Sequence, residues 1–359
     1  MARILFIAPH RPDRSPSQRF RFEQYLDFLK ENGWKYDFSY LISKKDDQFF
    51  YKKGFLLKKI WVIIKSAFKR FSDLRKAGKY DVVFIQREAF PTGSTYFERR
   101  FSKKTKVIYD FDDAIWLSNV SDANKKWNWL KNPEKTKEII RCADLIFAGN
   151  QYLANYAKKF NKNIVIVPTT IDTKSYKPMP KTPSNKITIG WSGSITTIQH
   201  FEYAEAVLID LVKKYGDKLH IKVIGDKNYT NENFPVEALP WKAETEIREL
   251  CSFDIGIMPL PDDEWAKGKC GLKGLQYMAL AVPTIMSPIG VNDEIIQDGE
   301  NGFLASSKEE WIEKISLLIE DSNLRTSIGE KGRATVEEKY SINANKTLYL
   351  KQLIELVGE

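Results

Sequence analysis

The chain has 359 residues, of which 43% are hydrophobic and 13% aromatic, and it carries a formal net charge of +9. This length favours two domains, and this hydrophobic content is enough to build both cores, so a disordered chain is excluded. The three cysteines and three histidines are scattered, which argues against a disulfide framework and a zinc site and fits a reducing compartment.

The apolar run at residues 4–8 is shorter than the apolar region of a signal peptide and far shorter than the roughly 20 residues of a membrane-spanning helix. No other run in the sequence reaches that length. We therefore expect a cytoplasmic protein.

Short apolar runs alternate with amphipathic stretches along the first half of the chain. This rhythm of strand and helix favours parallel sheets that are covered by helices on both faces. The predicted strands lie at residues 2–9, 80–86, 106–116 and 143–150, and predicted helices lie at 21–33 and 151–160.

A polar, proline-bearing interval at residues 176–186 is typical of a linker, and the same rhythm starts again after it. The later predicted strands lie at 187–193, 219–226, 253–260 and 282–288, and predicted helices lie at 203–216 and 274–281. We therefore predict an α/β chain with Rossmann-like domains at 1–175 and 187–340 and a last helix at 341–359. Ligands of open parallel sheets bind beyond the carboxyl ends of the strands, so a cleft between the domains is the expected site.

The positive charge concentrates between residues 52 and 76, which hold nine Lys or Arg residues and one acid, Asp73. Within residues 55–71 the apolar positions have the spacing of one helical face, with lysines around the rest. These positions are Leu56, Leu57, Ile60, Ile63, Ile64, Ala67, Phe68 and Phe71. The plain interpretation is a core helix of the first domain, and the alternative is docking on an anionic membrane with Trp61 at the headgroups. Nucleic acid is not expected, because the segment lacks a recognised binding module.

Polar and charged residues lie at or directly after the ends of two predicted strands of the first domain. They are Gln86, Arg87 and Glu88 after one strand, and Asp110, Asp112 and Asp113 at the end of the next. Carboxylates at the end of an apolar strand are costly unless they are solvated, paired or used. Asp112 or Asp113 can hydrogen-bond a sugar or accept a proton from a hydroxyl group. The alternatives are a divalent-metal site and a helix N-cap at Asp113.

In the second domain, lysines and glycines gather directly before a predicted helix. They are Lys267, Gly268, Lys269, Gly271, Lys273 and Gly274. Exposed amides, the positive end of a helix dipole and mobile ammonium groups together suit a diphosphate, and the alternative is a solvated loop. Gly193 and Ser194 follow the first strand of this domain and suit either a phosphate or a tight turn. The Asp262 carboxylate can accept hydrogen bonds from sugar or ribose hydroxyls, and the alternative is an exposed acidic residue in a turn.

Residues 253–305 resemble the donor-binding region of bacterial and archaeal family 4 glycosyltransferases, which have the GT-B fold. Supporting similarity lies in the stretches VPTTIDTKSYKP (167–178), IGWSGS (189–194) and GEKGRATVEEKYS (329–341). The resemblance implies two Rossmann-like domains that face each other across a cleft, with a C-terminal helix that crosses back to the first domain. It implies a nucleotide-sugar donor in the second domain and an acceptor in the first.

The resemblance also assigns roles to single residues. The two glutamates that this family commonly carries fall on Gly268 and Gln276, and Lys273 matches its frequent lysine at the helix start. Arg19 and Arg21 match, with Ser17, a Ser-x-Arg-x-Arg pattern of one branch of these enzymes. Such arginines can bind a carboxylate or phosphate, or pair with a surface acid.

We therefore predict an enzyme that transfers a sugar from a nucleoside diphosphate to a hydroxyl group, with retention, and needs neither a metal nor a cofactor. The acceptor is a glycan, a polysaccharide or a lipid-linked molecule. The predicted residues are Asp112, Asp113 and Lys273 for catalysis, Gly193, Ser194, Asp262, Lys269, Gly271, Leu272, Lys273 and Gln276 for the donor, and Arg19, Arg21 and Arg87 for the acceptor. The alternative is an inactive GT-B-like sugar-nucleotide-binding or partner subunit, because the glutamate pair is missing.

Overall fold

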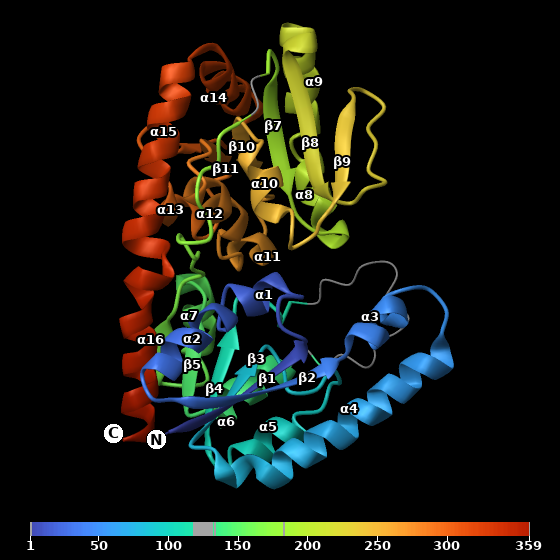
Figure 1. The fold of residues 1–359 in the computed structure, drawn as a ribbon, viewed down its shortest axis with the longest axis vertical. Helices are drawn as coiled ribbons and strands as arrows, with labels where there is room; N and C mark the ends of the chain where they lie inside the picture. The colour runs from blue at the N-terminus through green and yellow to red at the C-terminus, as the bar shows by residue number, and fades with distance from the viewer. Residues whose placement is uncertain (1, 118–131, 133, 182–183, 359) are drawn as a thin grey trace. The chain divides into compact units, whose positions relative to one another are not determined.

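The computed structural model describes residues 2–117, 132, 134–181 and 184–358, so positions 182 and 183 of the predicted linker lie outside the described residues. The chain forms two compact units, each with its own sheet (Figure 1). Unit 1 comprises Met1–Pro168 and Lys346–Glu359, and unit 2 comprises Thr169–Asn345.

Unit 1 contains a six-stranded parallel sheet in the order β2-β1-β3-β4-β5-β6. Its strands are β1 (Arg3–His10), β2 (Lys35–Ile42), β3 (Val82–Gln86), β4 (Lys106–Phe111), β5 (Leu145–Ala148) and β6 (Ile164–Ile166). Its helices are α1 (Pro16–Arg19), α2 (Leu26–Glu31), α3 (Lys44–Phe50), α4 (Leu56–Lys76), α5 (Tyr96–Phe101), α6 (Lys135–Cys142) and α7 (Gln151–Ala157), with short 3-10 turns η1 (Glu23–Tyr25) and η2 (Ala77–Lys79). The central strands are continuous apolar runs because helices cover both of their faces.

Unit 2 repeats this plan with a parallel sheet in the order β12-β11-β10-β7-β8-β9. Its strands are β7 (Ile187–Ser192), β8 (Leu219–Gly225), β9 (Val236–Pro240), β10 (Ile255–Met258), β11 (Thr284–Met286) and β12 (Phe303–Leu304). Its helices are α8 (Ile198–Glu202), α9 (Glu205–Tyr215), α10 (Glu246–Cys251), α11 (Glu264–Lys267), α12 (Leu272–Ala279), α13 (Asn292–Ile295), α14 (Lys308–Glu320) and α15 (Ser322–Thr335), with short 3-10 turns η4 (Ile195–Thr197) and η5 (Gly216–Lys218) and a π-helix η6 (Val336–Tyr340). The two parallel sheets confirm the predicted α/β class.

The last helix, α16 (Ile342–Val357), begins in unit 2 and continues into unit 1. Its Tyr349 is fully buried among unit 1 residues, and its ring stacks on Tyr25 with centroids 4.4 Å apart. The same ring contacts Phe84 and Phe147 from the sheet. The prediction that the C-terminal helix returns to the first domain is therefore confirmed.

Helix α4 contradicts one expectation, because its apolar face does not pack into the core. Leu57 is 82% exposed and Phe68 is 70% exposed. The buried residues of the helix are Val62, Ser66, Arg70 and Leu74, which form a different face. The interpretation of residues 55–71 as a core helix is therefore wrong, because the side chains that were expected to build the core point to solvent. Within the described residues, no helix has both the length and the apolar content to cross a bilayer.

Candidate functional site

The first part of the candidate site in unit 2 is the close contact between the ends of β7 and β8. The Gly193 amide donates to the Ile224 carbonyl at 2.8 Å. A Cβ at Gly193 would lie 2.1 Å from the Trp191 ring, so no larger residue fits without displacing that ring. Gly225 has φ +142° and packs against the Gly193 carbonyl. Glycine therefore lets the backbone turn tightly at the carboxyl end of the sheet, where ligands of such folds bind.

Ser194 follows this turn and is exposed. Its hydroxyl lies 2.9 Å from the Thr196 hydroxyl and 3.2 Å from that of Thr197, and its amide donates to Thr197 Oγ1. The three hydroxyl side chains therefore form one polar group at the turn.

The second part is the start of α12. Gly271 precedes the helix with φ +68°, a left-handed conformation that favours glycine, and a Cβ there would lie 2.3 Å from Ile295. Leu272, the first helical residue, is half-buried, and no side chain caps this helix end. The first turn of a helix presents amides without intrahelical partners and a partial positive charge, which favours an anion.

Lys273 connects these two parts. Its ammonium nitrogen lies 5.2 Å from the centroid of the Trp191 ring, the same ring that packs against Gly193. The Tyr277 hydroxyl, one turn further along α12, accepts a hydrogen bond from the Ser192 amide at 2.8 Å. The structure thus brings together the glycine turn and the lysine that the sequence predicted for one diphosphate site.

A buried histidine lies near the ammonium groups of this site. His200 is 3% exposed, and its Nδ1 has no hydrogen-bond partner among the described residues. The pKa of His200 is lowered to about 4, first by burial and then by the ammonium groups of Lys273 and Lys269. From the sequence, His200 was regarded only as one of three scattered histidines. The signal that could have found it is its position on α8, directly after the glycine turn.

The two other lysines of this loop have different surroundings. Lys269 lies with its ammonium nitrogen 4.7 Å from the centroid of the Trp265 ring. Lys267 instead pairs with Glu264 at 2.8 Å and with Asp262 at 3.6 Å. Because this lysine and its two acids are largely exposed, their charges offset one another at the surface.

Gln276 belongs to a buried hydrogen-bond network. Its Nε2 donates to the Tyr176 hydroxyl at 3.0 Å and to Glu246 Oε1 at 3.2 Å. Tyr176 donates to Glu246 Oε2 at 2.7 Å, and Trp241 Nε1 donates to Glu246 Oε1 at 2.7 Å. Gln276 is 4% exposed, and both of its amide hydrogens serve this network, while its role in donor binding stays a prediction.

In unit 1, one arginine joins the two carboxylates that were predicted for catalysis. Arg87 Nε donates to Asp112 Oδ1 at 2.8 Å, and Arg87 Nη2 lies 3.7 Å from Asp113 Oδ2. Asp113 Oδ1 accepts from the Ala114 amide at 3.1 Å. Arg87 adopts φ +61°, which is a strained conformation for a residue with a side chain. Such strain is found where the surrounding structure holds a side chain in one position, as at binding sites.

The remaining predicted arginines have different surroundings. Arg21 is 1% exposed and forms a buried ion pair with Asp110, with Nη2 and Oδ1 2.5 Å apart, while its Nη1 donates to the Val167 carbonyl. Burial raises the pKa of Asp110, and the Arg21 guanidinium opposes that shift. Because this guanidinium is buried and paired, it is not exposed to a sugar acceptor, and Arg21 has a structural role in unit 1. Arg19 is half-buried, with its guanidinium carbon 5.0 Å from the Phe20 ring centroid.

His10 ends β1 at the same edge of the unit 1 sheet and was not singled out from the sequence. Its Nε2 lies 3.3 Å from the Tyr51 hydroxyl, and its Nδ1 has no partner among the described residues. Burial lowers the pKa of His10 to about 4, and Arg14 contributes next. The signal for this residue was its place at the carboxyl end of the first predicted strand.

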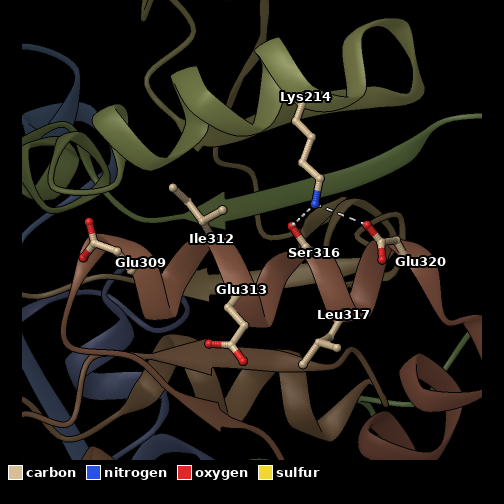
Figure 2. A pocket seen from close by; sticks show the side chains of 7 residues that line it. All are labelled: Lys214, Glu309, Ile312, Glu313, Ser316, Leu317 and Glu320. Carbon is tan, nitrogen blue, oxygen red and sulfur yellow. Dashed lines mark hydrogen bonds and ion pairs between the residues drawn. The ribbon is translucent and has the colours of Figure 1, made fainter.

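A groove of about 380 Å³ lies elsewhere on unit 2, between α9 and α14 (Figure 2). Lys214 crosses it to Ser316 and Glu320 at 3.3 Å each. The other lining residues are Glu309, Ile312, Glu313 and Leu317. None of the predicted site residues lines this groove, so we do not include it in the candidate site.

Comparisons with known proteins show similarity to glycosyltransferases. Residues 186–321 match the family model for group 1 glycosyl transferases. An uncharacterized glycosyltransferase of Methanocaldococcus jannaschii is 24% identical over 304 residues, which are 78% of this chain and 76% of the relative.

Two solved structures share the fold over nearly the whole chain. A glycosyltransferase from Rickettsia africae superposes with a TM-score of 0.69 at 17% identity, covering 99% of this chain and 98% of that one. HepE of Anabaena, in complex with UDP and glucose, superposes with a TM-score of 0.65 at 13% identity, covering 99% and 100%. These likenesses confirm the predicted GT-B class of fold, and the family-model match agrees with the predicted resemblance to glycosyltransferases.

Proposed function

We propose that this protein transfers a sugar from a nucleoside diphosphate to a hydroxyl group of an acceptor, with retention of the anomeric configuration. The observation that carries the proposal is the cluster of Lys273, Lys269 and His200 beside the Gly193 turn. UDP is the nucleotide to test first, because the structurally similar HepE was solved with UDP and glucose. The acceptor class is a glycan, a polysaccharide or a lipid-linked molecule, and the proposed location is the cytoplasm.

The main electrostatic task of this reaction is to stabilise the leaving diphosphate. The bond between the anomeric carbon and the phosphate oxygen breaks, and negative charge accumulates on the diphosphate. Lys273 and the first turn of α12 supply positive charge at one place, with Lys269 nearby. No protein-bound metal is needed for this role in the proposal.

The proposed task of unit 1 is to bind the acceptor. A bond forms from the acceptor oxygen to the anomeric carbon, and the hydroxyl proton must leave. In this proposal, Asp112 or Asp113 hydrogen-bonds the sugar or takes that proton, and the contacts of Arg87 to both carboxylates support their common role. Arg19 remains the proposed acceptor contact on α1.

The donor proposal is tested by titration calorimetry with UDP and UDP-sugars. We expect Lys273→Ala to weaken UDP binding by about tenfold to a hundredfold, because a charge-assisted contact to phosphate is lost. Lys267→Ala is the matched control in the same loop, because Glu264 and Asp262 already balance its charge. Equal affinities for the two variants and the wild type would contradict the phosphate assignment.

A second candidate function is that of a GT-B-like subunit that binds sugar nucleotides without turnover. Gly268 has no side chain and Gln276 is committed to a buried network, so neither position offers the family's usual carboxylate. A donor-hydrolysis and transfer assay separates the two functions. Tight UDP-sugar binding without hydrolysis or transfer, for every donor and acceptor tried, would favour the binding subunit.

A further inference from the structure

Helix α4 has a continuous apolar surface that faces solvent. Among the described residues, nine large hydrophobic side chains of residues 55–71 are exposed: Phe55, Leu56, Leu57, Ile60, Trp61, Ile63, Ile64, Phe68 and Phe71. Five of them form a stripe with alternating spacings of four and three residues, namely Leu57, Trp61, Ile64, Phe68 and Phe71, which we call the α4 stripe. This spacing keeps side chains on one helical face. Large exposed apolar patches of this kind mark surfaces that bind a partner or a membrane.

The opposite face of α4 is fixed to unit 1 by a buried arginine. Arg70 is 0% exposed, and its guanidinium donates to the Ala89 carbonyl at 2.6 Å and to the Ala8 carbonyl at 3.1 Å. Its Nη1 also donates to Ser39 and Asp73 at 2.8 Å each. These bonds specify which side of the helix faces the protein. The α4 stripe is therefore held outward by its own helix, which Figure 1 shows along one side of unit 1.

All charged residues of the segment 52–72 are positive. Lys52, Lys53 and Lys58 are exposed near the start of the helix, and Lys65 and Lys69 flank the stripe further along. Lys65 pairs with Asp46 at 2.5 Å, and the Lys69 ammonium lies 4.5 Å from the Tyr40 ring centroid. No acidic residue occurs between residues 52 and 72 of the sequence.

We propose that the α4 stripe and its lysines bind the surface of an anionic lipid bilayer. An interfacial helix inserts its apolar side chains at the boundary between headgroups and acyl chains, and flanking lysines contact anionic headgroups. Trp61, 64% exposed near the middle of the exposed face, has the amphipathic ring that prefers this boundary. This inference concerns a surface of unit 1 and is independent of the proposed sugar transfer.

A second copy of the chain fits this surface less well. The spacing of the stripe is that of a coiled-coil seam, but the positions beside it carry the lysines Lys58 and Lys65, of which Lys65 pairs with Asp46 of α3. Two such helices would bring like charges together, which is unfavourable. Anionic lipid instead complements both the apolar stripe and its positive border.

The test is sedimentation of the whole chain with vesicles of phosphatidylcholine, alone or mixed with phosphatidylglycerol. We expect binding to the mixed vesicles and little to the neutral ones, with weaker binding as salt increases. The double variant Trp61→Ser, Phe68→Ser should lower partitioning by about a hundredfold, because two apolar side chains no longer enter the bilayer. Lys53→Ala and Lys58→Ala should each lower it by about fivefold.

Leu317→Ser is the matched control, because Leu317 is a similarly exposed apolar residue (44%) on α14 of unit 2, and its partitioning should equal that of the wild type. Equal sedimentation with both vesicle types, or none with either, would overturn the inference. Light scattering gives the oligomeric state of the same samples. A wild-type dimer that Trp61→Ser, Phe68→Ser converts to a monomer would assign the stripe to self-association and would also overturn it. Because no sugar nucleotide enters these measurements, their failure is distinct from failure of the proposed transferase activity.

Discussion

His200 shows how a single buried residue can report on the candidate donor site. Its imidazole lies in the interior beside two ammonium groups, and burial together with these charges favours the neutral form. A diphosphate bound at Lys273 and Lys269 would reverse that electrostatic effect, because its negative charge favours the imidazolium. The residue is therefore sensitive both to pH and to an anion at the site.

We predict that His200 makes folding less favourable in acid. Its pKa is about 4 in the folded chain and 6.5 ordinarily, so the unfolded chain binds more protons between these values. The free energy of unfolding is therefore not reduced by this group above pH 6.5. It falls as the pH decreases towards 4, by up to about 3 kcal/mol from His200. Urea unfolding of the wild type and of His200→Gln across this range measures the effect. The variant should lose less stability in acid, and identical pH profiles would contradict the assignment.

A second prediction at this scale concerns Gln276. The Gln276→Glu variant restores the glutamate of the resembled family but places a second carboxylate beside Glu246, where the native amide now donates at 3.2 Å. We expect a loss of about 3 kcal/mol at neutral pH, because a buried donor becomes a like charge. Gln276→Met is the control that removes the hydrogen bonds without adding charge, and it should lose less. Urea midpoints of the three proteins decide this, and a Glu variant as stable as the wild type would refute it.

The local residue patterns of the candidate site were predicted from sequence, whereas the buried partners that distant positions supply were not. The lysine and glycine positions of residues 267–274 are local, so their pattern was visible. The partners of Gln276 come from positions 176 and 246, and the partner of Arg21 is Asp110. No local pattern indicates which distant polar groups become buried together, so these roles needed the fold.

The strands that were predicted from the sequence are the central strands of the two sheets. Predicted strands coincide with β1, β3, β4 and β5 in unit 1 and with β7, β8, β10 and β11 in unit 2. The edge strands β2, β6, β9 and β12 were not predicted. A central parallel strand is buried on both faces and is a continuous apolar run, whereas an edge strand such as β9 is partly exposed and carries mixed residues.

Helix α4 was predicted as an element but assigned the wrong inward face. Hydrophobic spacing locates an apolar face, and burial of that face is the ordinary outcome for a helix in a globular protein. Here the inward face is specified by hydrogen bonds from Arg70 to two carbonyls and two side chains. Such a polar anchor has no hydrophobic signal in the sequence.

The return of α16 to unit 1 depends on the Tyr349 ring. We predict that Tyr349→Ala lowers the free energy of unfolding by about 3–5 kcal/mol, because a fully buried aromatic ring is removed from Tyr25, Phe84 and Phe147. Tyr349→Phe is the matched variant. The hydroxyl has no hydrogen-bond partner among the described residues, so its loss should leave stability unchanged or raise it. Chemical unfolding followed by circular dichroism measures both, and a large loss for the Phe variant would show that the hydroxyl is bonded.

For the whole molecule, the repeated strand and helix pattern was enough to predict two domains of similar plan. Each unit has its own sheet and its own buried core, and α16 is the element shared between them. The proposed donor contacts all lie in unit 2, while the α4 stripe and the carboxylates near Arg87 lie in unit 1. The two proposed binding activities can therefore be measured separately on the intact chain.

We predict that UDP protects unit 2 from hydrogen exchange at two segments that are far apart in sequence. These are residues 192–202, which include the glycine turn and α8, and residues 267–279, which include α12. A ligand slows exchange where it contacts amides or suppresses local opening, because the bound state must open less often. Peptides from α14 at the groove of Lys214 and from α4 should exchange at unchanged rates, which provides controls in both units. Protection at α14 with none at α12 would show that the nucleotide binds in the groove and would contradict the proposed donor site. The comparison is informative because both surfaces belong to unit 2 but differ in the sign and accessibility of their charges.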